Sequence, residues 1–383
     1  MSQDRRPRVV ALTDVPFWKS AFGSHARLAA LFGALTAELD LSVLSFAPSA
    51  VGAGSDRVRV VPHGSVAPLA APSGRHSRRP FLRDRVRPDW LAAARGLLDA
   101  ERPDAVIVAY LDRSWLLDAV PPETVTLLDS HDVMSQRSLS FARFGAAPSI
   151  APTAMEEREI MAAYDAVIAI SDADADDIRG RLGVPGVIVA PHAPPLPPPL
   201  PPSPPAPGPM RLLFVGSYAE ANIAGLRWLL DQVWPALGGR FRLAVAGGVC
   251  GAIPAPPPGV TLLGRVDDLG AAMAAADVLV NPVFMGGGLK IKTLDAMAAG
   301  LPSVNSREAV RGLEAAVGGA LLVADGRLEF IAHLLRLERD PGLRADLGAA
   351  ARAFVERELS PARAFGELIA FLHRARRRVE AAP

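Results

Sequence analysis

Cysteine, lysine and excess charge of either sign are all scarce in this chain of 383 residues. The single cysteine, Cys250, excludes an internal disulfide and any metal centre built from several cysteines, and it is typical of a reducing compartment. The formal net charge is +1, so the composition gives no reason to expect a nucleic acid as partner. The amino end has no apolar stretch of signal-peptide or membrane-spanning length. We therefore expect a cytoplasmic protein that does not span a membrane.

Arginine supplies nearly all of the positive charge, and the only lysines are Lys19, Lys290 and Lys292. Two of the three lie in the stretch NPVFMGGGLKIKTLDAMAAGLPSV (281–304), directly after three glycines. Half of all residues are hydrophobic and 21% are charged, which is typical of a soluble globular protein. The two lysines are thus not part of a general excess of lysine, and their position needs a local explanation.

Residues 1–190 are predicted to form an α/β domain. Solidly apolar strands alternate with helices of 3.6-residue periodicity, which indicates a parallel sheet covered on both faces. Ser171 is expected to cap a helix that begins with the acidic residues DADADD. The expected strands are 8–15, 41–47, 104–111, 125–130 and 164–171, and the other expected helices are 25–39, 88–103 and 152–164.

The alternation stops at a proline-rich segment and then starts again. Residues 191–209 are expected to form a semi-rigid connector, because proline removes backbone donors and holds the chain extended. Residues 210–360 are predicted to form a second α/β domain, and the last helix (361–378, within 361–383) is expected to fold back onto the first. The expected strands of the second domain are 210–217, 241–248, 259–266, 277–283 and 301–306, and its helices are 224–237, 269–276 and 290–300.

A strand, three glycines and a helix start in succession form a favourable site for an anion. Glycine lets a phosphate approach the backbone, and the free N–H groups of the helix end favour negative charge. Lys290 and Lys292 would add ammonium donors, although two residues two apart on a helix do not face the same way, so one of them is enough to touch phosphate. The alternative is a solvated turn, but positive charge at a helix start is unfavourable without an anion nearby.

Two further positions are candidates on local grounds. Lys19 follows the first predicted strand, as Lys290 and Lys292 follow a later one, and Gly23 in the same loop would let a ligand approach the backbone of the first domain. Asp295 lies about one turn into the helix after the glycines. Its carboxylate would accept hydrogen bonds from two sugar or ribose hydroxyls, or it is an ordinary charged position of the helix.

The string GGGLKIKTLDAMAAGLPSV, together with LLFVGSYAEANIAGLRWLLDQVWPAL and VTLLGRVDDLGAAMAAADVLVNPV before it, resembles the C-terminal domain of the GT-B glycosyltransferases. The nearest group is the retaining, family-4-like enzymes, the glycosyl transferases group 1. The resemblance covers roughly residues 210–360 and is looser over 1–190. It implies an α/β protein of two Rossmann-like domains whose parallel sheets face a central cleft, an N-terminal acceptor domain and a C-terminal domain that binds a nucleotide sugar.

The resemblance also assigns residues. Asp295 takes the place of the second glutamate of the family's carboxylate pair and would hold the ribose hydroxyls, whereas the first falls on Gly287, so that carboxylate is missing. The loop at Gly216 lacks the family's usual arginine and lysine, and its first basic residue is Arg227. The loop residues Gly286, Gly287, Gly288 and Leu289, with Lys290 and Lys292, would then hold the diphosphate instead. Arg265 and Val266 match the position that lines the base.

The implied reaction moves a sugar from a nucleotide diphosphate, UDP- or GDP-linked, to an unknown acceptor that is a glycan, a lipid-linked molecule or a small molecule. We expect retention and no metal, because no aspartate-x-aspartate motif lies in a suitable loop, and no other cofactor. His131 and Asp132 follow a strand and are expected to face the cleft, where a histidine of the family contacts the donor sugar or the reacting centre. Asp129 is expected to be buried and to orient them. No covalent nucleophile is assigned.

Residues 74–88 carry six arginines around Phe81 and Leu82. This segment is either a peripheral contact with the inner face of an anionic membrane or a solvated loop. Two other functions stay open beside glycosyl transfer: a catalytically weak nucleotide-sugar-binding protein and a sugar-nucleotide epimerase of the same fold. A nicotinamide-dependent oxidoreductase is disfavoured, because the loop after the first strand lacks the GxGxxG pattern.

Overall fold

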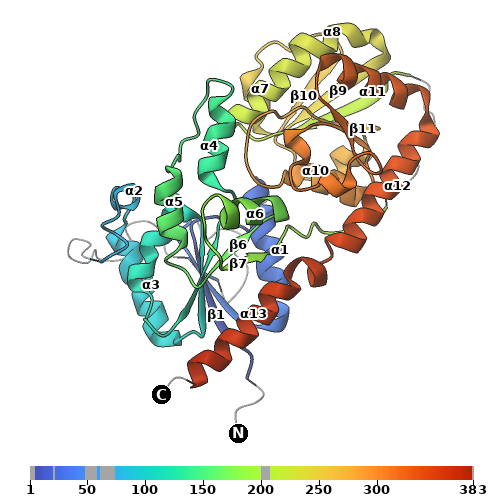
Figure 1. Ribbon diagram of the computed structural model, residues 1–383. Coiled ribbons are helices and arrows are strands. Elements are labelled where there is room, and N and C mark those ends of the chain that lie inside the picture. The colour runs from blue at the N-terminus through green and yellow to red at the C-terminus, as the bar shows by residue number, and fades with distance from the viewer. Residues whose placement is uncertain (1–4, 20–21, 48–57, 61–73, 200–207, 382–383) are drawn as a thin grey trace. The chain divides into compact units, whose positions relative to one another are not determined.

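The computed structural model of the chain describes residues 5–19, 22–47, 58–60, 74–199 and 208–381 (Figure 1). The chain folds as two compact units. Unit 1 consists of residues 1–20, 24–192 and 361–383, and unit 2 consists of residues 21–23 and 193–360. The carboxyl-terminal segment is thus part of the unit that the amino-terminal half forms.

Unit 1 is built on a seven-stranded sheet with the strand order β3-β2-β1-β4-β5-β6-β7, and every neighbouring pair is parallel. The central strands are buried along almost their whole length, which is why they read as continuous apolar runs in the sequence. The strands are β1 (Arg8–Thr13), β2 (Asp40–Ser45), β3 (Val58–Val60), β4 (Ala105–Ala109), β5 (Val125–Asp129), β6 (Ala166–Ala169) and β7 (Val187–Val189).

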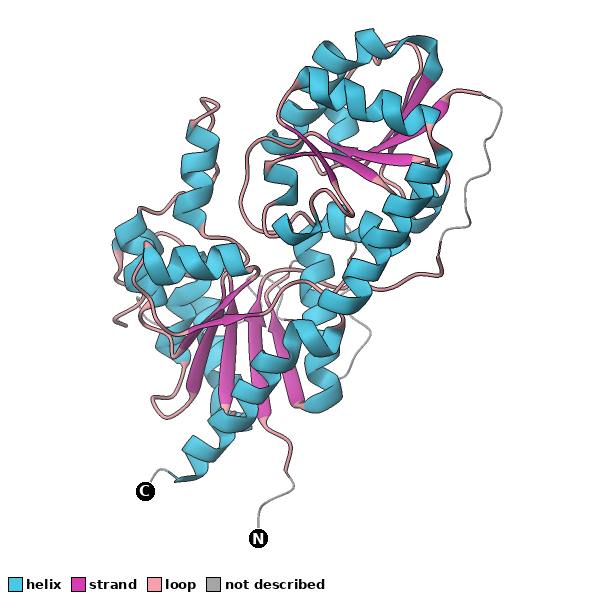
Figure 2. Ribbon diagram, turned by 45° about the vertical axis from the view of Figure 1, so that its right-hand side comes forward, coloured by secondary structure: helices cyan, strands magenta, loops and turns pink. Residues whose placement is uncertain are grey.

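Helices cover the sheet of unit 1 (Figure 2). They are α1 (Gly23–Glu38), α2 (Pro80–Arg83), α3 (Pro88–Glu101), α4 (Met134–Ala142), α5 (Ala154–Met161), α6 (Asp172–Gly180) and α13 (Pro361–Ala381), with the 3₁₀ helix η1 (Leu111–Ala119). Ser171 caps α6 as expected, since its hydroxyl accepts a hydrogen bond from the backbone N–H of Asp174 at 3.1 Å. Helix α13 packs on β7 and β4 through Phe365, Leu368 and Leu372, all fully buried.

Unit 2 has a six-stranded parallel sheet with the strand order β10-β9-β8-β11-β12-β13. Its core on one face is formed by Phe214, Val245, Val280 and the side chains that α7 and α11 pack against them. The strands are β8 (Met210–Val215), β9 (Phe241–Ala246), β10 (Val260–Gly264), β11 (Val278–Asn281), β12 (Ser303–Ser306) and β13 (Leu322–Ala324).

The helices of unit 2 include one interruption that the sequence analysis did not predict. The single helix expected over 224–237 is α7 (Glu220–Trp228), a π-helical turn η2 (Leu229–Val233) and α8 (Trp234–Leu237). Pro235 in α8 lacks a backbone N–H, so regular α-helical hydrogen bonding cannot continue through it. The remaining helices are α9 (Leu269–Ala274), α10 (Ile291–Ala299), α11 (Arg327–Arg339) and α12 (Pro341–Glu358), with 3₁₀ helices at η3 (Gly238–Arg240), η4 (Gly248–Ala252), η5 (Glu308–Val310) and η6 (Glu314–Ala316).

The predicted fold class is confirmed, because both units are parallel sheets with helices and every strand expected from the sequence is present. The elements that the sequence analysis did not assign are short edge strands, such as β3, β7 and β13, and the helices α4, α11 and α12. The short strands span three residues each, which is too few for a periodic pattern.

Candidate functional site

In unit 2 the loops that follow β8 and β9 begin with a close contact between their backbones. Gly216 follows β8, and its N–H donates to the carbonyl oxygen of Ala246 at 2.9 Å. Gly247, which follows β9, has a left-handed φ of +103°, and a Cβ there would lie 2.2 Å from the carbonyl oxygen of Gly216. Position 247 therefore needs glycine, and the close backbone contact fixes the loop that leads from β8 into α7.

The glycine loop between β11 and α10 turns its carbonyl groups toward Lys290. The Nζ atom of Lys290 donates to the carbonyl oxygens of Gly287 and Gly288 at 3.1 and 3.2 Å. Across a trans peptide the N–H points the opposite way, so the N–H groups of Gly288 and Leu289 point away from that ammonium group. Gly286 and Gly288 have φ values of +151° and +58°, which allow this turn.

Three N–H groups of this loop have no acceptor. Those of Gly287, Gly288 and Leu289 donate to no other group within the described residues, although Gly288 and Leu289 are buried. Buried backbone N–H groups nearly always have a partner, so unpaired ones at the start of a helix mark a place for an anion or for water. This finding agrees with the anion site that the sequence predicts here.

Lys290 itself is fully occupied. Besides the two carbonyl oxygens, its Nζ atom lies 3.0 Å from Oε1 of Glu308 in η5, and both side chains are largely buried. An ammonium group has three donors, and these three contacts use all of them. Lys290 therefore holds the loop in shape and has its charge neutralised, which makes it a poor ligand for phosphate.

Lys292 is placed differently, on the side of α10 that faces β8 and α7. Its Nζ atom donates to the carbonyl oxygen of Val215 at 2.8 Å and to Oδ1 of Asn222 at 2.7 Å, and it lies 5.2 Å from the ring centre of Phe214. Within the described residues Lys292 has no carboxylate partner, and one of its three donors has no acceptor. Burial, together with the charge of Lys290, lowers the pKa of Lys292 to about 7. An anion beside Nζ would reverse both effects.

Asp295 lies three residues after Lys292 and therefore on the same side of α10. Its carboxylate is partly buried and has no hydrogen-bond or ion-pair partner within the part of the chain that the structure describes. Burial raises the pKa of Asp295 to about 7. An unpaired carboxylate in such surroundings is costly, which is the situation expected of a group that hydroxyl donors of a ligand satisfy.

Hydrogen bonds of buried side chains hold α10 and the glycine loop in place. Nδ2 of Asn281, the last residue of β11, donates to Oγ1 of Thr293 at 2.9 Å, and Oγ1 of Thr293 donates to the carbonyl oxygen of Ala309 at 3.2 Å. The hydroxyl of Ser306 donates to the carbonyl oxygen of Val283. Helix α10 and the strands β11 and β12 are thus connected by hydrogen bonds just below the glycine loop.

The remaining candidates of unit 2 lie at the end of β10. Gly264 has a left-handed φ of +68°, and its carbonyl oxygen accepts a hydrogen bond from the N–H of Gly247 at 2.6 Å. Arg265 is exposed and has no partner within the described residues, whereas Val266 packs partly buried against the core. Their assignment to a nucleotide base stays a prediction.

In unit 1 a buried polar cluster lies at the carboxyl ends of β4 and β5. Asp129, the last residue of β5, is fully buried, as expected, and its Oδ1 accepts a hydrogen bond from Arg27 of α1 at 2.8 Å. The ring of His131 stacks on Tyr110, with ring centres 4.0 Å apart and planes 5° apart. Both residues have left-handed backbone, with φ of +58° and +73°, an unusual conformation for non-glycine residues that marks functional or strained sites.

The predicted role of His131 beside a ligand stays a prediction, and the structure shows the surroundings of its ring. Its side chain is buried, and burial lowers its pKa to about 4 although the charge of Asp129 opposes the change. The Nε2 atom lies 3.3 Å from Oδ2 of Asp129 but has no hydrogen-bond partner within the described residues. Asp132 lies nearer the surface, and Nη1 of Arg137 is 3.5 Å from its carboxylate. His131 is thus a neutral buried group, and Asp132 is the more accessible of the two.

Two loop positions of the sequence analysis lie next to α1. Lys19 precedes residues that the structure does not describe, and its backbone carbonyl oxygen lies 2.7 Å from Nδ1 of His25. Gly23 is the first residue of α1. No contact in the structure gives Lys19 or Gly23 a role in binding, so both stay sequence-based predictions.

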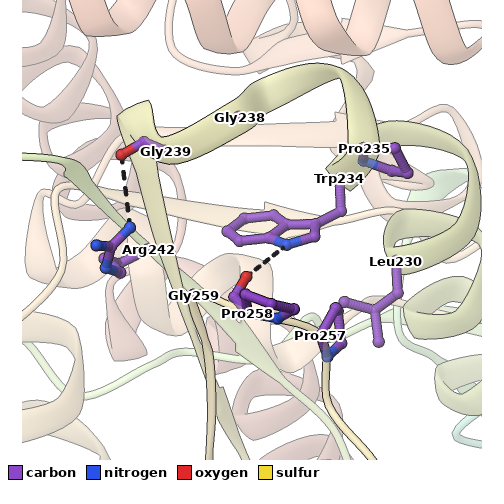
Figure 3. A pocket seen from close by; sticks show the side chains of 9 residues that line it. All are labelled: Leu230, Trp234, Pro235, Gly238, Gly239, Arg242, Pro257, Pro258 and Gly259. Atoms are coloured by element: carbon purple, nitrogen blue, oxygen red, sulfur yellow. Dashed lines mark hydrogen bonds between the residues drawn. The ribbon is translucent and has the colours of Figure 1, made fainter.

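A hollow of about 640 Å³ on unit 2 lies at the amino ends of β9 and β10 (Figure 3). It is lined by residues of η2, α8 and η3, by Arg242 of β9 and by residues 257–259, and Nε1 of Trp234 donates there to the carbonyl oxygen of Pro258 at 3.2 Å. Because the glycine loop and α10 follow the carboxyl ends of the strands, this hollow is on the opposite side and takes no part in the site.

The described residues contain neither a candidate metal cluster nor a helix that could span a membrane. No three histidine, cysteine, aspartate or glutamate side chains come close enough together there to hold a metal ion. None of the helices in those residues combines the length and the apolar character needed to cross a bilayer.

Two α/β units, each built on a sheet of parallel strands, form the GT-B fold of glycosyltransferases. Sucrose-phosphate synthase from Thermosynechococcus elongatus has a TM-score of 0.72, 19% sequence identity and coverage of 98% of this chain and 100% of its own. HepE from Anabaena, solved in complex with UDP, has a TM-score of 0.68, 14% identity and coverage of 96% and 100%. A glycosyltransferase from Rickettsia africae has a TM-score of 0.69, 10% identity and coverage of 97% and 98%.

Residues 209–340 match the family model described as glycosyl transferases group 1, which covers most of unit 2 and the candidate residues within it. No match is found among curated protein sequences. The resemblance to GT-B glycosyltransferases that the sequence indicated is therefore confirmed. The three structural neighbours named above are less than 25% identical and show the fold alone.

Proposed function

We propose that this protein is a glycosyltransferase that moves a sugar from a nucleotide diphosphate sugar to an acceptor, with unit 2 binding the donor. The observation that carries the proposal is the state of Lys292. It is a partly buried ammonium group with one unused donor and no carboxylate partner in the described residues, on the helix that follows three unpaired backbone N–H groups. A diphosphate supplies the negative charge and the acceptor oxygens that this arrangement lacks.

The donor would lie along the carboxyl edge of the unit 2 sheet. Its diphosphate would contact Lys292 and the N–H groups of Gly288 and Leu289, and its ribose hydroxyls would donate to Asp295, which has no other partner. Arg265 would contact the base. UDP- and GDP-linked sugars are the proposed donors, and HepE, of the same fold, was solved with UDP. No further cofactor is part of the proposal.

The chemical step breaks the bond between the anomeric carbon and the β-phosphate oxygen, and the electron pair of that bond goes to the nucleoside diphosphate. The acceptor oxygen forms the new bond to the anomeric carbon and gives its proton to the departing diphosphate. Negative charge grows on the leaving group during this step, and donors fixed in advance at that place lower the barrier. One such donor contributes roughly 3 kcal/mol.

Retention and independence of metal belong to the proposal and rest on the family-4-like resemblance. The acidic string after Ser171 supports the second point, because it forms the capped start of α6 and not a loop that could present aspartates to a diphosphate. In unit 1, Asp132 and the buried pair of His131 and Asp129 lie at the ends of strands where an acceptor would bind.

Nucleotide binding and turnover test the proposal separately. Thermal-shift measurements with UDP, GDP, ADP and TDP should give one clear ligand, which at a hundred times its dissociation constant adds about 2.7 kcal/mol of stability. Hydrolysis of the matching nucleotide sugar, with and without sugar and lipid-linked acceptors, should then give turnover. Binding without turnover would favour a nucleotide-sugar-binding protein, interconversion of free nucleotide sugars would favour an epimerase, and no binding at all would refute the proposal.

A further inference from the structure

Tyr218 is a large aromatic side chain that unit 2 leaves mostly uncovered. It is 67% exposed, and no other ring stacks on it within the described residues. Its hydroxyl group has no hydrogen-bond partner in that part of the chain. A single exposed aromatic residue is ordinary on a protein surface, so its surroundings decide whether it has a use.

Tyr218 lies at the point of the unit 2 sheet where the chain connections change face. It follows β8, whose neighbours in the sheet are β9 on one side and β11 on the other. Helix α7, which follows β8, packs through Ile223 on the same face as Phe214. Helix α10, which follows β11, packs through Ala296 on the opposite face with Leu213. Open parallel sheets bind ligands outside the carboxyl ends of two such strands.

The backbone around Tyr218 is fixed before any ligand binds. The carbonyl oxygen of Ser217 accepts a hydrogen bond from Nδ2 of Asn222 in α7 at 3.1 Å. The N–H group of Val249 in η4 donates to the carbonyl oxygen of Gly216 at 3.1 Å. The loop is thus bonded both to the helix that follows it and to the next loop along the sheet. An aromatic side chain on such a backbone has little conformational freedom to lose when a ligand binds.

Two glycines of η4 leave room for Tyr218. A Cβ at Gly248 would lie 3.1 Å from the backbone nitrogen of Tyr218, and a Cβ at Gly251 would lie 3.7 Å from Cδ2 and Cε2 of its ring. The ring therefore lies beside the backbone of η4, with no side chain of these two residues in between. Because η4 follows β9, the ring extends from the end of β8 toward the end of β9.

The end of β9 lies between the loops that carry Tyr218 and Arg265. The N–H group of Gly247 donates to the carbonyl oxygen of Gly264 at 2.6 Å, and a Cβ at Gly247 would lie 2.2 Å from the carbonyl oxygen of Gly216. Neighbouring strands are about 4.8 Å apart, so the two loops begin about 10 Å apart. A flat ring in contact with a side chain on each face needs about 3.5–4 Å on either side, which fits this interval.

The proposed position of the diphosphate is close to Tyr218. Nζ of Lys292 donates to the carbonyl oxygen of Val215, the last residue of β8, at 2.8 Å. Tyr218 follows three residues later, and three residues span at most about 10 Å. The same Nζ atom bonds to Asn222, which in turn holds Ser217 beside the tyrosine. In a nucleotide whose diphosphate contacts Lys292, the base is one ribose away and can therefore reach the tyrosine ring.

We propose that Tyr218 is a specificity-determining residue of the donor site and that its ring stacks on a face of the nucleotide base. This role rests on the proposed function and adds to it the group that recognises the aromatic part of the donor. Arg265 would contact the edge of the base and Tyr218 its face. Every base has a π-face, so stacking on Tyr218 would favour nucleotides over phosphate compounds that lack a base.

Binding measurements with a matched pair of ligands test the proposal. Isothermal titration calorimetry compares the preferred nucleoside diphosphate with ribose diphosphate, which has the same sugar and phosphates but no base. Tyr218→Ala should weaken binding of the nucleoside diphosphate about tenfold, because one stacked base is lost, and should leave binding of ribose diphosphate unchanged. Tyr218→Phe and Tyr218→Trp keep an aromatic ring and should bind the nucleoside diphosphate within about twofold of the unchanged protein.

Leu328→Ala is the matched control, because Leu328 is a 79% exposed apolar residue of α11 outside the site, and it should change neither affinity. Equal losses for both ligands in Tyr218→Ala would mean that the ring only holds the loop, which would overturn the proposal. A loss with the nucleotide sugar but not with the nucleoside diphosphate would also overturn it, since the ring would then contact the sugar. If the unchanged protein binds no nucleoside diphosphate, the proposed function is refuted as well. If it binds one and Tyr218→Ala binds it equally well, only the role of Tyr218 is refuted.

Discussion

Nζ of Lys292 lies 2.7 Å from Oδ1 of Asn222, which joins the helix after the glycine loop to the helix after β8. Nδ2 of Asn222 in turn donates to the carbonyl oxygen and to the hydroxyl of Ser217, at 3.1 and 3.2 Å. The ammonium group is thus held by a side chain from α7. The Gly216 loop has no basic residue of its own, and the asparagine of the helix that follows it positions a lysine that comes from α10.

Replacement of Lys292 tests the site most directly. Lys292→Gln should lower the affinity for the preferred nucleoside diphosphate and reduce kcat for sugar transfer by on the order of 10²-fold, because the donor aimed at the leaving group is lost. Isothermal titration calorimetry and initial rates measure the two effects. Arg339→Gln, at an exposed position of α11 outside the proposed site, is the control and should leave the affinity unchanged. Unchanged binding and rate in Lys292→Gln would remove the basis of the proposed function.

Lys290 should behave as a residue that stabilises the loop. Glu308→Gln leaves its largely buried ammonium group without a counter-charge and should lower the free energy of unfolding by roughly 1–3 kcal/mol. The double variant Lys290→Met/Glu308→Met removes both charges and should recover much of that loss. Urea denaturation of the three proteins gives the values. If Glu308→Gln is as stable as the unchanged protein, the ion pair does not hold the loop.

Nucleotide affinity should be greatest near pH 7. The pKa of Lys292 is lowered to about 7, so its charge, and with it the attraction for the diphosphate, is lost as pH rises above that value. The pKa of Asp295 is raised to about 7, so its ability to accept two ribose hydroxyls is lost as pH falls below that value. Calorimetric titrations from pH 5 to pH 9, taken as about the useful range around these pKa values, measure the profile.

Single variants separate the two sides of that profile. Lys292→Gln should abolish the loss of affinity at high pH and keep the loss at low pH. Asp295→Asn should do the opposite. A profile that is flat, or that neither variant changes, would show that neither group contacts the nucleotide in the way proposed.

Unit 1 should lose stability in mild acid because it buries neutral histidines. Burial lowers the pKa of His192 to about 3, with the charge of Arg27 acting in the same direction, and it lowers the pKa of His131 to about 4. Between these values and the ordinary pKa of 6.5 the unfolded chain binds more protons than the folded one, so stability falls as pH falls through this window. Each histidine should cost roughly 2 kcal/mol between pH 7 and pH 5.

His192→Leu isolates one of the two contributions. The side chain of His192 is fully buried and neither ring nitrogen has a hydrogen-bond partner within the described residues, so leucine removes a titrating group without breaking a bond. The difference in unfolding free energy between pH 7 and pH 5, measured in urea, should shrink in this variant by about 2 kcal/mol. An unchanged difference would mean that His192 is protonated in the folded state.

The sequence was most informative where local chemistry is repetitive. The apolar strands, the helices between them and the cap at Ser171 follow from periodicity and hydrogen-bonding rules that need no knowledge of distant contacts. It was least informative for the π-helical turn before Pro235 and for the three-residue edge strands. Such elements form because the neighbouring strand or core is already in place, and a short segment carries no pattern of its own.

The contacts of His131 could not be predicted from the sequence. The sequence predicts that a histidine at the end of a parallel strand faces a ligand, but it does not predict that His131 stacks on Tyr110 and lies buried beside Asp129. Nothing in the residues around position 131 indicates its left-handed backbone or its stacking partner, which follows another strand. Asn222, Glu308 and Arg27 were missed for the same reason, since each contributes through a partner from another element.

The sequence by itself determined that three glycines and two lysines stand at the start of α10, which predicts an anion-binding loop there. Only the tertiary structure decided which lysine is free to act. Glu308, 18 residues away in the chain, occupies Lys290, whereas Asn222, 70 residues away, holds Lys292 with a donor left over. The direction of an ammonium group is set by the acceptors that folding brings to it, and those acceptors come from strands and helices that only the folded sheet makes neighbours.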